Sequence, residues 1–186
     1  MNRAILICQL LFFSFFLGIS VSDVSAQTAS GRGRRSSAIT ASRTVRIGSL
    51  DRLPSASQIE KEAFDLINNE RRKKGLHPLI WSDRIARVAR THSKNMADQR
   101  FFSHRGKDGS TVSDRANKAG VKWAGIGENI VYFNGSREPA DFAVRCWMDS
   151  RGHKQNILNK NWQESGIGVT VTPDGTYYLT QVFLLH

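Results

Sequence analysis

Residues 166–183 read GIGVTVTPDGTYYLTQVF, and this stretch carries the clearest structural signal of the chain. Ile167, Val169 and Val171 alternate with small or polar residues, which is the period of a strand with one buried face. The sequence Pro-Asp-Gly at 173–175 is typical of a tight turn, and a run rich in β-branched and aromatic residues follows it at 176–184. The pattern predicts an antiparallel β-hairpin at the C-terminus.

Upstream of the hairpin the apolar residues recur at the three- and four-residue steps of helices. Four helices are predicted: one from Ser57 to Gly75, one after Ser82, one over 111–119, and one that starts near Pro139 and stops at Gly152. For the first helix, Ser57 and Glu60 match the spacing of a capping box. The segment 121–130 is either a third strand or an irregular lead-in. Helices followed by a hairpin indicate an α+β domain, with the helices packed on an antiparallel sheet.

The first 26 residues have the layout of a secretory signal peptide. Arg3 supplies a positive start, residues 4–20 are almost wholly apolar, and residues 24–26 (Val-Ser-Ala) are suited to a signal peptidase. We predict cleavage before Gln27, and hence a secreted or periplasmic protein with no transmembrane segment in the mature chain. An uncleaved membrane anchor is the alternative, but the apolar run is shorter than the ~20 residues that span a bilayer.

Residues 27–57 are predicted to form a basic, disordered linker. They hold six arginines and one acidic residue, Asp51, in a stretch rich in Ser, Thr, Ala and Gly, within a chain of formal net charge +11. The arginines could contact an anionic envelope polymer or phospholipid headgroups, although a solvated spacer is the simpler interpretation. Specific binding of nucleic acid is not expected, because no recognition fold accompanies the charge.

The two cysteines cannot cross-link the predicted domain, residues 58–186. Cys8 lies in the signal peptide, which leaves Cys146 alone. The domain must therefore rely on its hydrophobic core, which about 130 residues can supply. We expect a monomer in which Cys146 is a buried space-filler beside Trp147 rather than a nucleophile.

Four blocks of sequence, in this order, resemble the CAP superfamily of cysteine-rich secretory, antigen 5 and pathogenesis-related proteins. The blocks are residues 66–81, which begin with LINNER; residues 102–104 (FSH) with 127–130 (GENI); residues 147–158 (WMDSRGHKQNIL); and residues 166–183. The third block is most similar to the bacterial, disulfide-free branch of the family, which agrees with the single remaining cysteine. The resemblance covers nearly all of 58–186 and implies a CAP or SCP-like domain. Its expected fold is a three-layer α-β-α sandwich whose small antiparallel sheet ends in the C-terminal β-hairpin.

The resemblance also implies a shallow cleft, which animal and plant members build from two histidines and two glutamates. Two of these positions match, at His104 and Glu128, whereas Ser150 and Tyr178 stand at the positions of the other two. His153 follows Ser150 by three residues and would share its helical face if the helix continues that far. The predicted ligand-binding cleft therefore comprises all five residues.

Taken as chemical groups, His104 and Glu128 could form a general acid–base pair. The structural alternative is that Glu128 and Asn129 organise a bend through hydrogen bonds, with His104 as a partner. A catalytic zinc ion needs about three protein ligands. His104, His153 and Glu128 could supply them, but no short metal-ligand spacing supports zinc. No Ser or Cys lies in a nucleophile motif, and we interpret His92, on the apolar stripe of the second helix, as a partly buried core residue.

Two functions follow from these observations. We favour a secreted, non-catalytic module that binds an envelope component, a lipid or a small hydrophobic ligand. The sequence indicates no cofactor clearly and gives only weak support for zinc. The alternative is an extracellular, peptidase-like hydrolase that uses His104 and Glu128, with or without a metal.

Overall fold

The computed structural model describes residues 53–186. The predicted signal peptide (1–26) and most of the predicted linker (27–57) lie outside the described residues. Within 53–186, no helix combines the length and the apolar character needed to cross a bilayer.

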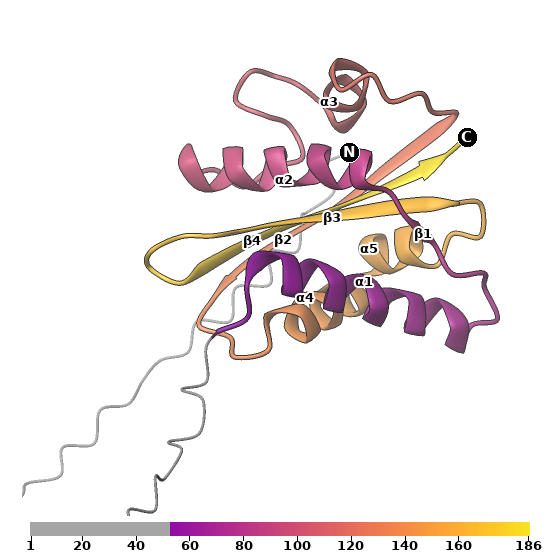
Figure 1. Ribbon diagram of the computed structural model, residues 1–186, viewed down its shortest axis with the longest axis horizontal. Coiled ribbons are helices and arrows are strands. Elements are labelled where there is room, and N and C mark those ends of the chain that lie inside the picture. The colour runs from indigo at the N-terminus through magenta and orange to yellow at the C-terminus, as the bar shows by residue number, and fades with distance from the viewer. Residues whose placement is uncertain (1–52) are drawn as a thin grey trace, which may run out of the picture. The chain divides into compact units, whose positions relative to one another are not determined.

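Five helices and four strands make up the described domain (Figure 1). In chain order they are α1 (Ala56–Lys73), β1 (Ile80–Trp81), α2 (Asp83–Asp98), α3 (Val112–Lys118), β2 (Gly125–Asn134), α4 (Pro139–Asp149), α5 (Arg151–Ile157), β3 (Glu164–Val171) and β4 (Thr176–Leu185). The predicted α+β class is confirmed.

The four strands form one sheet in the order β1-β3-β4-β2. Strands β3 and β4 are the predicted antiparallel hairpin, closed at Thr172 and Thr176 by backbone hydrogen bonds. Strand β2 pairs with the other side of β4 along ten residues, so the segment after 121 does supply a third long strand. The two-residue strand β1, which the sequence pattern did not predict, runs parallel to β3 at the opposite edge.

The sheet is the middle of three layers. Helices α2 and α3 cover one face, and α1, α4 and α5 cover the other (Figure 1). Each interface has its own apolar core. Trp147 and Phe183 lie in the core under α1, α4 and α5, whereas Ile85 and Val182 lie in the core under α2 and α3. The predicted α-β-α sandwich is therefore confirmed, and its two buried interfaces supply the hydrophobic core expected of the domain.

Two glycines in β3 allow α2 to lie directly on the sheet. A Cβ atom at Gly168 would come within 2.0 Å of the Arg90 nitrogen, and one at Gly166 within 2.3 Å of the Ala86 nitrogen. Both contacts are with the backbone of α2, which cannot rotate out of the way as a side chain can. The Gly-x-Gly pattern therefore sets the distance between α2 and β3.

The capping prediction for α1 is wrong by two residues. Ser55 is the N-cap, and its hydroxyl and backbone N–H form the capping box with Gln58. Glu60 faces inward instead. It accepts three hydrogen bonds from Arg90, at 2.6, 2.9 and 3.1 Å, and one from the backbone N–H of Val169 at 3.1 Å. The Glu60 carboxylate therefore binds residues far away in the sequence and does not cap α1. Helix α1 begins at Ala56, within the last residues of the predicted linker.

Two further expectations fail around α4. Gly152 does not stop this helix, because α4 ends at Asp149 and Gly152 lies inside α5. Ser150 separates the two helices with an extended backbone (φ −87°, ψ 120°). Cys146 is half-buried at the margin of the core rather than fully buried, although it does pack against the core under α4.

Candidate functional site

The imidazole of His104 and the carboxylate of Glu128 are in direct contact. His104 lies in the segment between α2 and α3, and Glu128 lies on β2, with 2.8 Å between Nδ1 and Oε1. Since a carboxylate only accepts, Nδ1 carries the proton and donates it to Glu128. The His104 side chain is 48% exposed and that of Glu128 only 3%. One edge of the pair is thus open to solvent, while its carboxylate is enclosed.

Arg115, which sequence reasoning missed, completes this cluster from α3. Its Nη2 donates to the second oxygen of Glu128 at 2.6 Å, and its side chain is only 8% exposed. The guanidinium also donates to the backbone oxygens of His104, at 3.3 Å, and Ser110, at 3.0 Å. Each Glu128 oxygen therefore has a donor, and the buried carboxylate has a cationic partner in a low-dielectric setting. Arg115 lies eleven and thirteen residues from its partners, so no local spacing indicated its role.

His92 is a second buried histidine next to this cluster. Its ring is fully buried, and Nε2 lies 2.9 Å from the carbonyl oxygen of Ser103. Because that carbonyl can only accept, Nε2 carries the proton, and Nδ1 is left buried without a partner among residues 53–186. Burial lowers the pKa of His92, and the positive charge of Arg115 lowers it further, against the opposing effect of Glu128. His92 is therefore a core histidine, as expected, but it is fully rather than partly buried, and only one of its ring nitrogens has a partner among residues 53–186.

His153 lies on α5, which packs on the opposite face of the sheet from α3 (Figure 1). Asn129 donates to its backbone oxygen at 3.2 Å, and Asn156 donates to the side-chain oxygen of Asn129 at 2.9 Å. Burial lowers the pKa of His153, and the charge of His104 contributes to the same direction. The chain breaks between α4 and α5, so Ser150 is the N-cap of α5 and His153 lies in its first turn. Within residues 53–186, Ser150 makes no side-chain hydrogen bond to His104 or Glu128.

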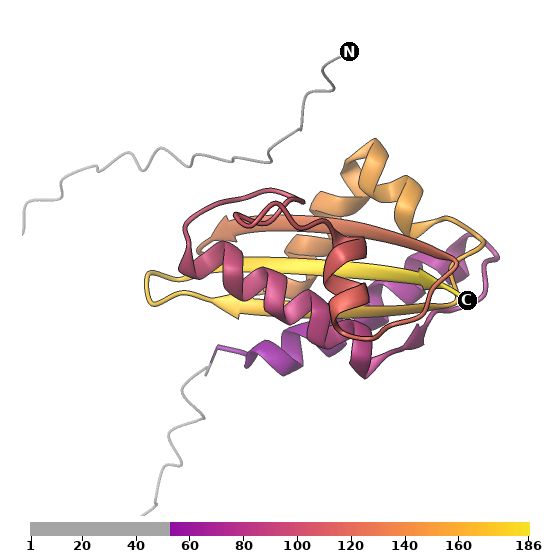
Figure 2. The same ribbon diagram turned by 90° about the horizontal axis from the view of Figure 1, so that it is seen from above.

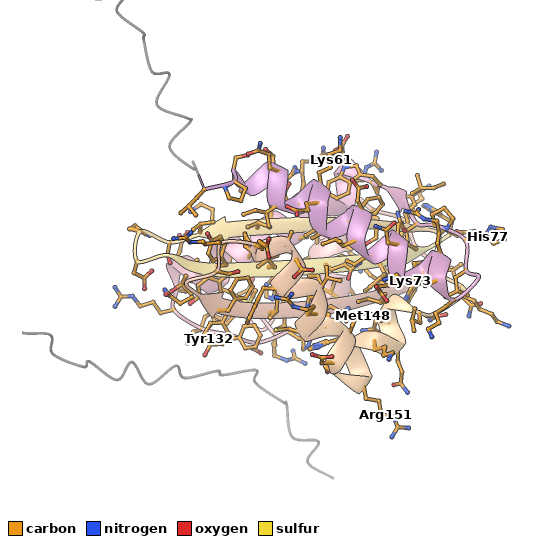
Figure 3. All side chains as sticks on the ribbon, turned by 90° about the horizontal axis from the view of Figure 1, so that it is seen from below. Lys61, Lys73, His77, Tyr132, Met148 and Arg151 are labelled. Carbon is orange, nitrogen blue, oxygen red and sulfur yellow. The ribbon has the colours of Figure 1, made fainter. Side chains whose placement is uncertain are left out.

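Tyr178 lies on the same face of the sheet as Glu128 but farther along it. Its partner across the β2–β4 ladder is Tyr132, four residues beyond Glu128, which corresponds to about 13 Å along a strand. The rings of Tyr132 and Tyr178 stack with centroids 5.7 Å apart, and Phe102 packs against Tyr132 at 4.7 Å. Figure 3 labels Tyr132 at the margin of the molecule. Tyr178 thus belongs to an aromatic row beside the His104–Glu128 pair.

The residues at this site do not fit a zinc ion. Within 53–186, no group of three His, Cys, Asp or Glu side chains is close enough to hold a metal. Glu128 already has a hydrogen-bond donor on each oxygen, and one of these donors is the cationic Arg115. A metal ligated by Glu128 would have to displace this guanidinium or lie beside it, at an electrostatic cost. His104 and His153 remain candidate metal ligands only as a pair.

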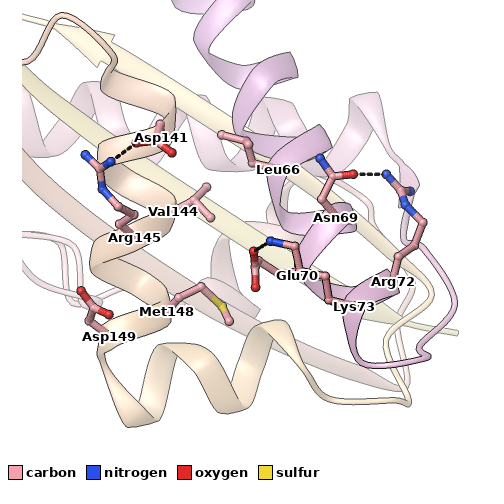
Figure 4. A pocket seen from close by; sticks show the side chains of 10 residues that line it. All are labelled: Leu66, Asn69, Glu70, Arg72, Lys73, Asp141, Val144, Arg145, Met148 and Asp149. Atoms are coloured by element: carbon pink, nitrogen blue, oxygen red, sulfur yellow. Dashed lines mark hydrogen bonds and ion pairs between the residues drawn. The ribbon is translucent and has the colours of Figure 1, made fainter.

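A separate groove lies between α1 and α4 on the opposite face of the sheet (Figure 4). It has a volume of about 520 Å³, and three apolar side chains line it: Leu66, Val144 and Met148. Charged side chains flank them, and most are paired along their own helix, as in Glu70–Lys73 and Asp141–Arg145. These pairs lie along each helix rather than across the groove. Of the three apolar side chains, Val144 is buried, and Leu66 and Met148 are partly buried.

The sequence is similar to one protein family and to two proteins of Bacillus subtilis. The model of the cysteine-rich secretory protein family, CAP, matches residues 64–183. The uncharacterized protein YkwD of Bacillus subtilis is 36% identical over 114 residues, which cover 61% of this chain and 43% of YkwD. The uncharacterized membrane protein YlbC of the same organism is 39% identical over 125 residues, covering 67% of this chain and 34% of YlbC. The chain therefore spans less than half the length of either relative.

Solved structures show the same fold. An extracellular SCP-domain protein of Bacillus anthracis superposes with a TM-score of 0.58 at 32% identity, covering 70% of this chain and 43% of that protein. An outer surface protein of Borrelia burgdorferi gives a TM-score of 0.65 at 20% identity, covering 72% of this chain and 96% of that protein. The second likeness concerns the fold alone.

Proposed function

Because this chain belongs to the cysteine-rich secretory protein (CAP) family, we propose that it is an exported, non-catalytic module that binds a lipid or small hydrophobic component of the cell envelope. The observation that carries this proposal is the α1–α4 groove. Its apolar strip of Leu66, Val144 and Met148 suits an acyl chain or a similar apolar body. The charged side chains on both flanks would accommodate a polar headgroup.

Export is part of the same proposal. The N-terminal sequence has the layout of a signal peptide. The relative from Bacillus anthracis is described as extracellular. We therefore place this chain outside the cytoplasm, secreted or periplasmic, with the basic segment 27–57 available to contact anionic envelope polymers or lipid headgroups.

The geometry of His104, Glu128 and Arg115 favours a structural role over catalysis. Glu128 has a donor on each oxygen, and Arg115 ties this carboxylate to the backbone of the segment that carries His104. Within 53–186, no Ser or Thr side chain forms a hydrogen bond with the imidazole of His104. A hydrolase would need such an activated nucleophile or a bound water. In this proposal, the hydrogen bonds among the three residues hold the segment between α2 and α3 against β2.

The groove is tested by filling it. Purified protein is titrated with cis-parinaric acid, an acyl-chain probe whose fluorescence rises in apolar surroundings. Met148→Trp should fill the groove and weaken binding by at least about tenfold, while the volume-conserving Met148→Leu should bind like wild type. Equal affinity in both variants, with folding confirmed by circular dichroism, would contradict binding in this groove.

The hydrolase alternative has its own measurement. Wild type, His104→Ala and Glu128→Gln are assayed with ester and peptide substrates. All three should remain at background. Hydrolysis by wild type that both variants lose while they stay folded would instead assign an enzymatic function to this pair.

A further inference from the structure

A second cavity is lined by residues of α2, α3 and the segment that precedes α3. These elements lie on the other face of the sheet from α1 and α4 (Figures 1 and 2). Its volume is about 320 Å³, enough for a ligand of a few heavy atoms up to a small sugar. The buried Val88 of α2 and the exposed Ala119 at the end of α3 are the apolar residues of the lining, and the remaining lining residues are polar or charged. The two helices thus border an open pocket with charged side chains around apolar surface, and the proposed function of the α1–α4 groove does not use it.

Three cationic side chains line this cavity. Arg115 is nine-tenths buried, and its Nε is enclosed without a hydrogen-bond partner among residues 53–186. Arg87 from α2 and Lys118 from α3 are exposed, and neither forms an ion pair with another described residue. Two exposed cations without an ion pair on facing helices, next to the buried guanidinium of Arg115, favour a ligand that carries an oxyanion.

Hydrogen-bond acceptors lie beside these cations. Asp108 and Asp114 also line the cavity, and hydrogen bonds from Ser110 and Thr111, respectively, lower the pKa of each carboxyl group. Both carboxylates therefore stay charged, and a bare anion would be repelled by them. Hydroxyl groups on the ligand would remove this conflict, because they can donate to the two carboxylates and to Thr91 or Asn95.

We propose that the α2–α3 cavity binds a polyol phosphate: a ligand whose phosphate lies against Arg87, Arg115 and Lys118 and whose hydroxyls contact Asp108 and Asp114. Phosphate suits this set better than a carboxylate because it offers more acceptor oxygens to three separate cations. The ligand is either a free small molecule or one unit of a phosphate-bearing polymer. This site is separate from the α1–α4 groove, and its existence does not depend on the function proposed for that groove.

Arg115 links this cavity to the His104–Glu128 pair. The same guanidinium that lines the cavity donates to Glu128 and to the backbone oxygen of His104. A phosphate that engages Arg115 will therefore alter the electrostatic surroundings of His104. This contact predicts a spectroscopic change at His104 although the ligand does not touch it.

The experiment is an NMR titration of the full exported protein with sn-glycerol 3-phosphate, inorganic phosphate and glycerol in separate arms. With glycerol phosphate, we expect amide shifts at Thr91, Ser110 and Arg115, and a shift of the His104 imidazole signal. Inorganic phosphate should bind more weakly and glycerol not measurably. Equal affinity for the two phosphates would contradict the polyol part of the proposal. Shifts spread over all basic surfaces, or none at millimolar ligand, would overturn the site.

Charge-matched variants test the residues. Arg87→Ala with Lys118→Ala should weaken binding of glycerol phosphate by at least about tenfold. The control pair, Arg84→Ala with Lys122→Ala, removes the same charge from exposed residues that do not line the cavity. It should bind like wild type at physiological salt. Ala119→Trp, which fills the cavity from an exposed position, should abolish binding. Equal loss in both charge pairs would show that only the net charge matters and would refute the site.

Discussion

Replacing Gly168 by alanine tests the packing that positions α2 over the sheet. The added Cβ would lie 2.0 Å from the Arg90 nitrogen, 2.3 Å from the Ala89 carbonyl carbon and 2.4 Å from the Arg90 Cα. Ordinary van der Waals contact begins at 3.4 Å, so α2 would have to retreat by about 1.4 Å at this point. All three atoms belong to the helix backbone, and no side-chain rotation can relieve the clash.

The cost follows from what α2 would lose by moving. The helix buries Ile85, Val88 and Ala89 against β3 and β4, and its Ser93 donates to the Gly168 carbonyl at 2.9 Å. Overpacking of a well-packed interface costs about 1–3 kcal/mol, and a clash with backbone on this scale lies at or above the upper end. We therefore expect Gly168→Ala to lower the free energy of unfolding by about 3 kcal/mol, a large share of a domain's ~5–15 kcal/mol.

Gly152 is the matched control. It lies in α5, and a Cβ added there would meet no atom within 4 Å. Alanine is the better helix former, so Gly152→Ala should be neutral or stabilise by about 0.5 kcal/mol.

The assay is urea unfolding followed by far-ultraviolet circular dichroism, together with thermal melts, in which Gly168→Ala should lower the melting temperature by about 10 °C. A loss of less than 1 kcal/mol in Gly168→Ala would show that α2 has room to move and would refute the close-approach argument. A loss of similar size in Gly152→Ala would show that the effect is not specific to the α2–β3 contact.

Two further predictions concern the buried polar groups near the candidate site. Glu128→Gln leaves the buried guanidinium of Arg115 without its counter-ion and should cost about 3 kcal/mol in urea unfolding. The control Glu62→Gln, at an exposed position of α1, should cost less than about 0.5 kcal/mol, and equal effects would contradict a buried ion pair. Burial lowers the pKa of His92 below its ordinary value of 6.5. As the pH falls below 6.5, His92 becomes protonated in the unfolded chain before it does so in the folded chain, and this favours unfolding. Stability should therefore be full above pH 6.5 and should fall as the pH drops below it. His92→Gln should flatten this dependence, and an unchanged pH profile in that variant would contradict the assignment.

The hairpin and the helices were accessible from the sequence because their signals are local. Strand alternation at 167–171 and the turn at 173–175 are properties of neighbouring residues, and the structure confirms both. The predicted start of α1 and the predicted end of α4 were wrong. In the first case a local capping signal competed with a distant contact, and in the second the helix ended before the residue expected to stop it. Glu60 has capping-box spacing, yet its carboxylate binds Arg90, thirty residues away on α2. Gly152 resembles a helix stop, but the chain had already broken at Ser150 and begun a new helix.

For the candidate site, the sequence by itself determined only which residues were worth examining. Resemblance to a family indicated His104 and Glu128, because both lie in short motifs that keep their spacing along the chain. The tertiary structure alone decided that Arg115 joins them, that Tyr178 lies farther along the sheet, and that two cavities open on opposite faces. These facts depend on how α2, α3, α4 and α5 dock on the sheet. Docking is set by side-chain volume and by close approaches such as that at Gly168, and neither leaves a periodic trace in the sequence.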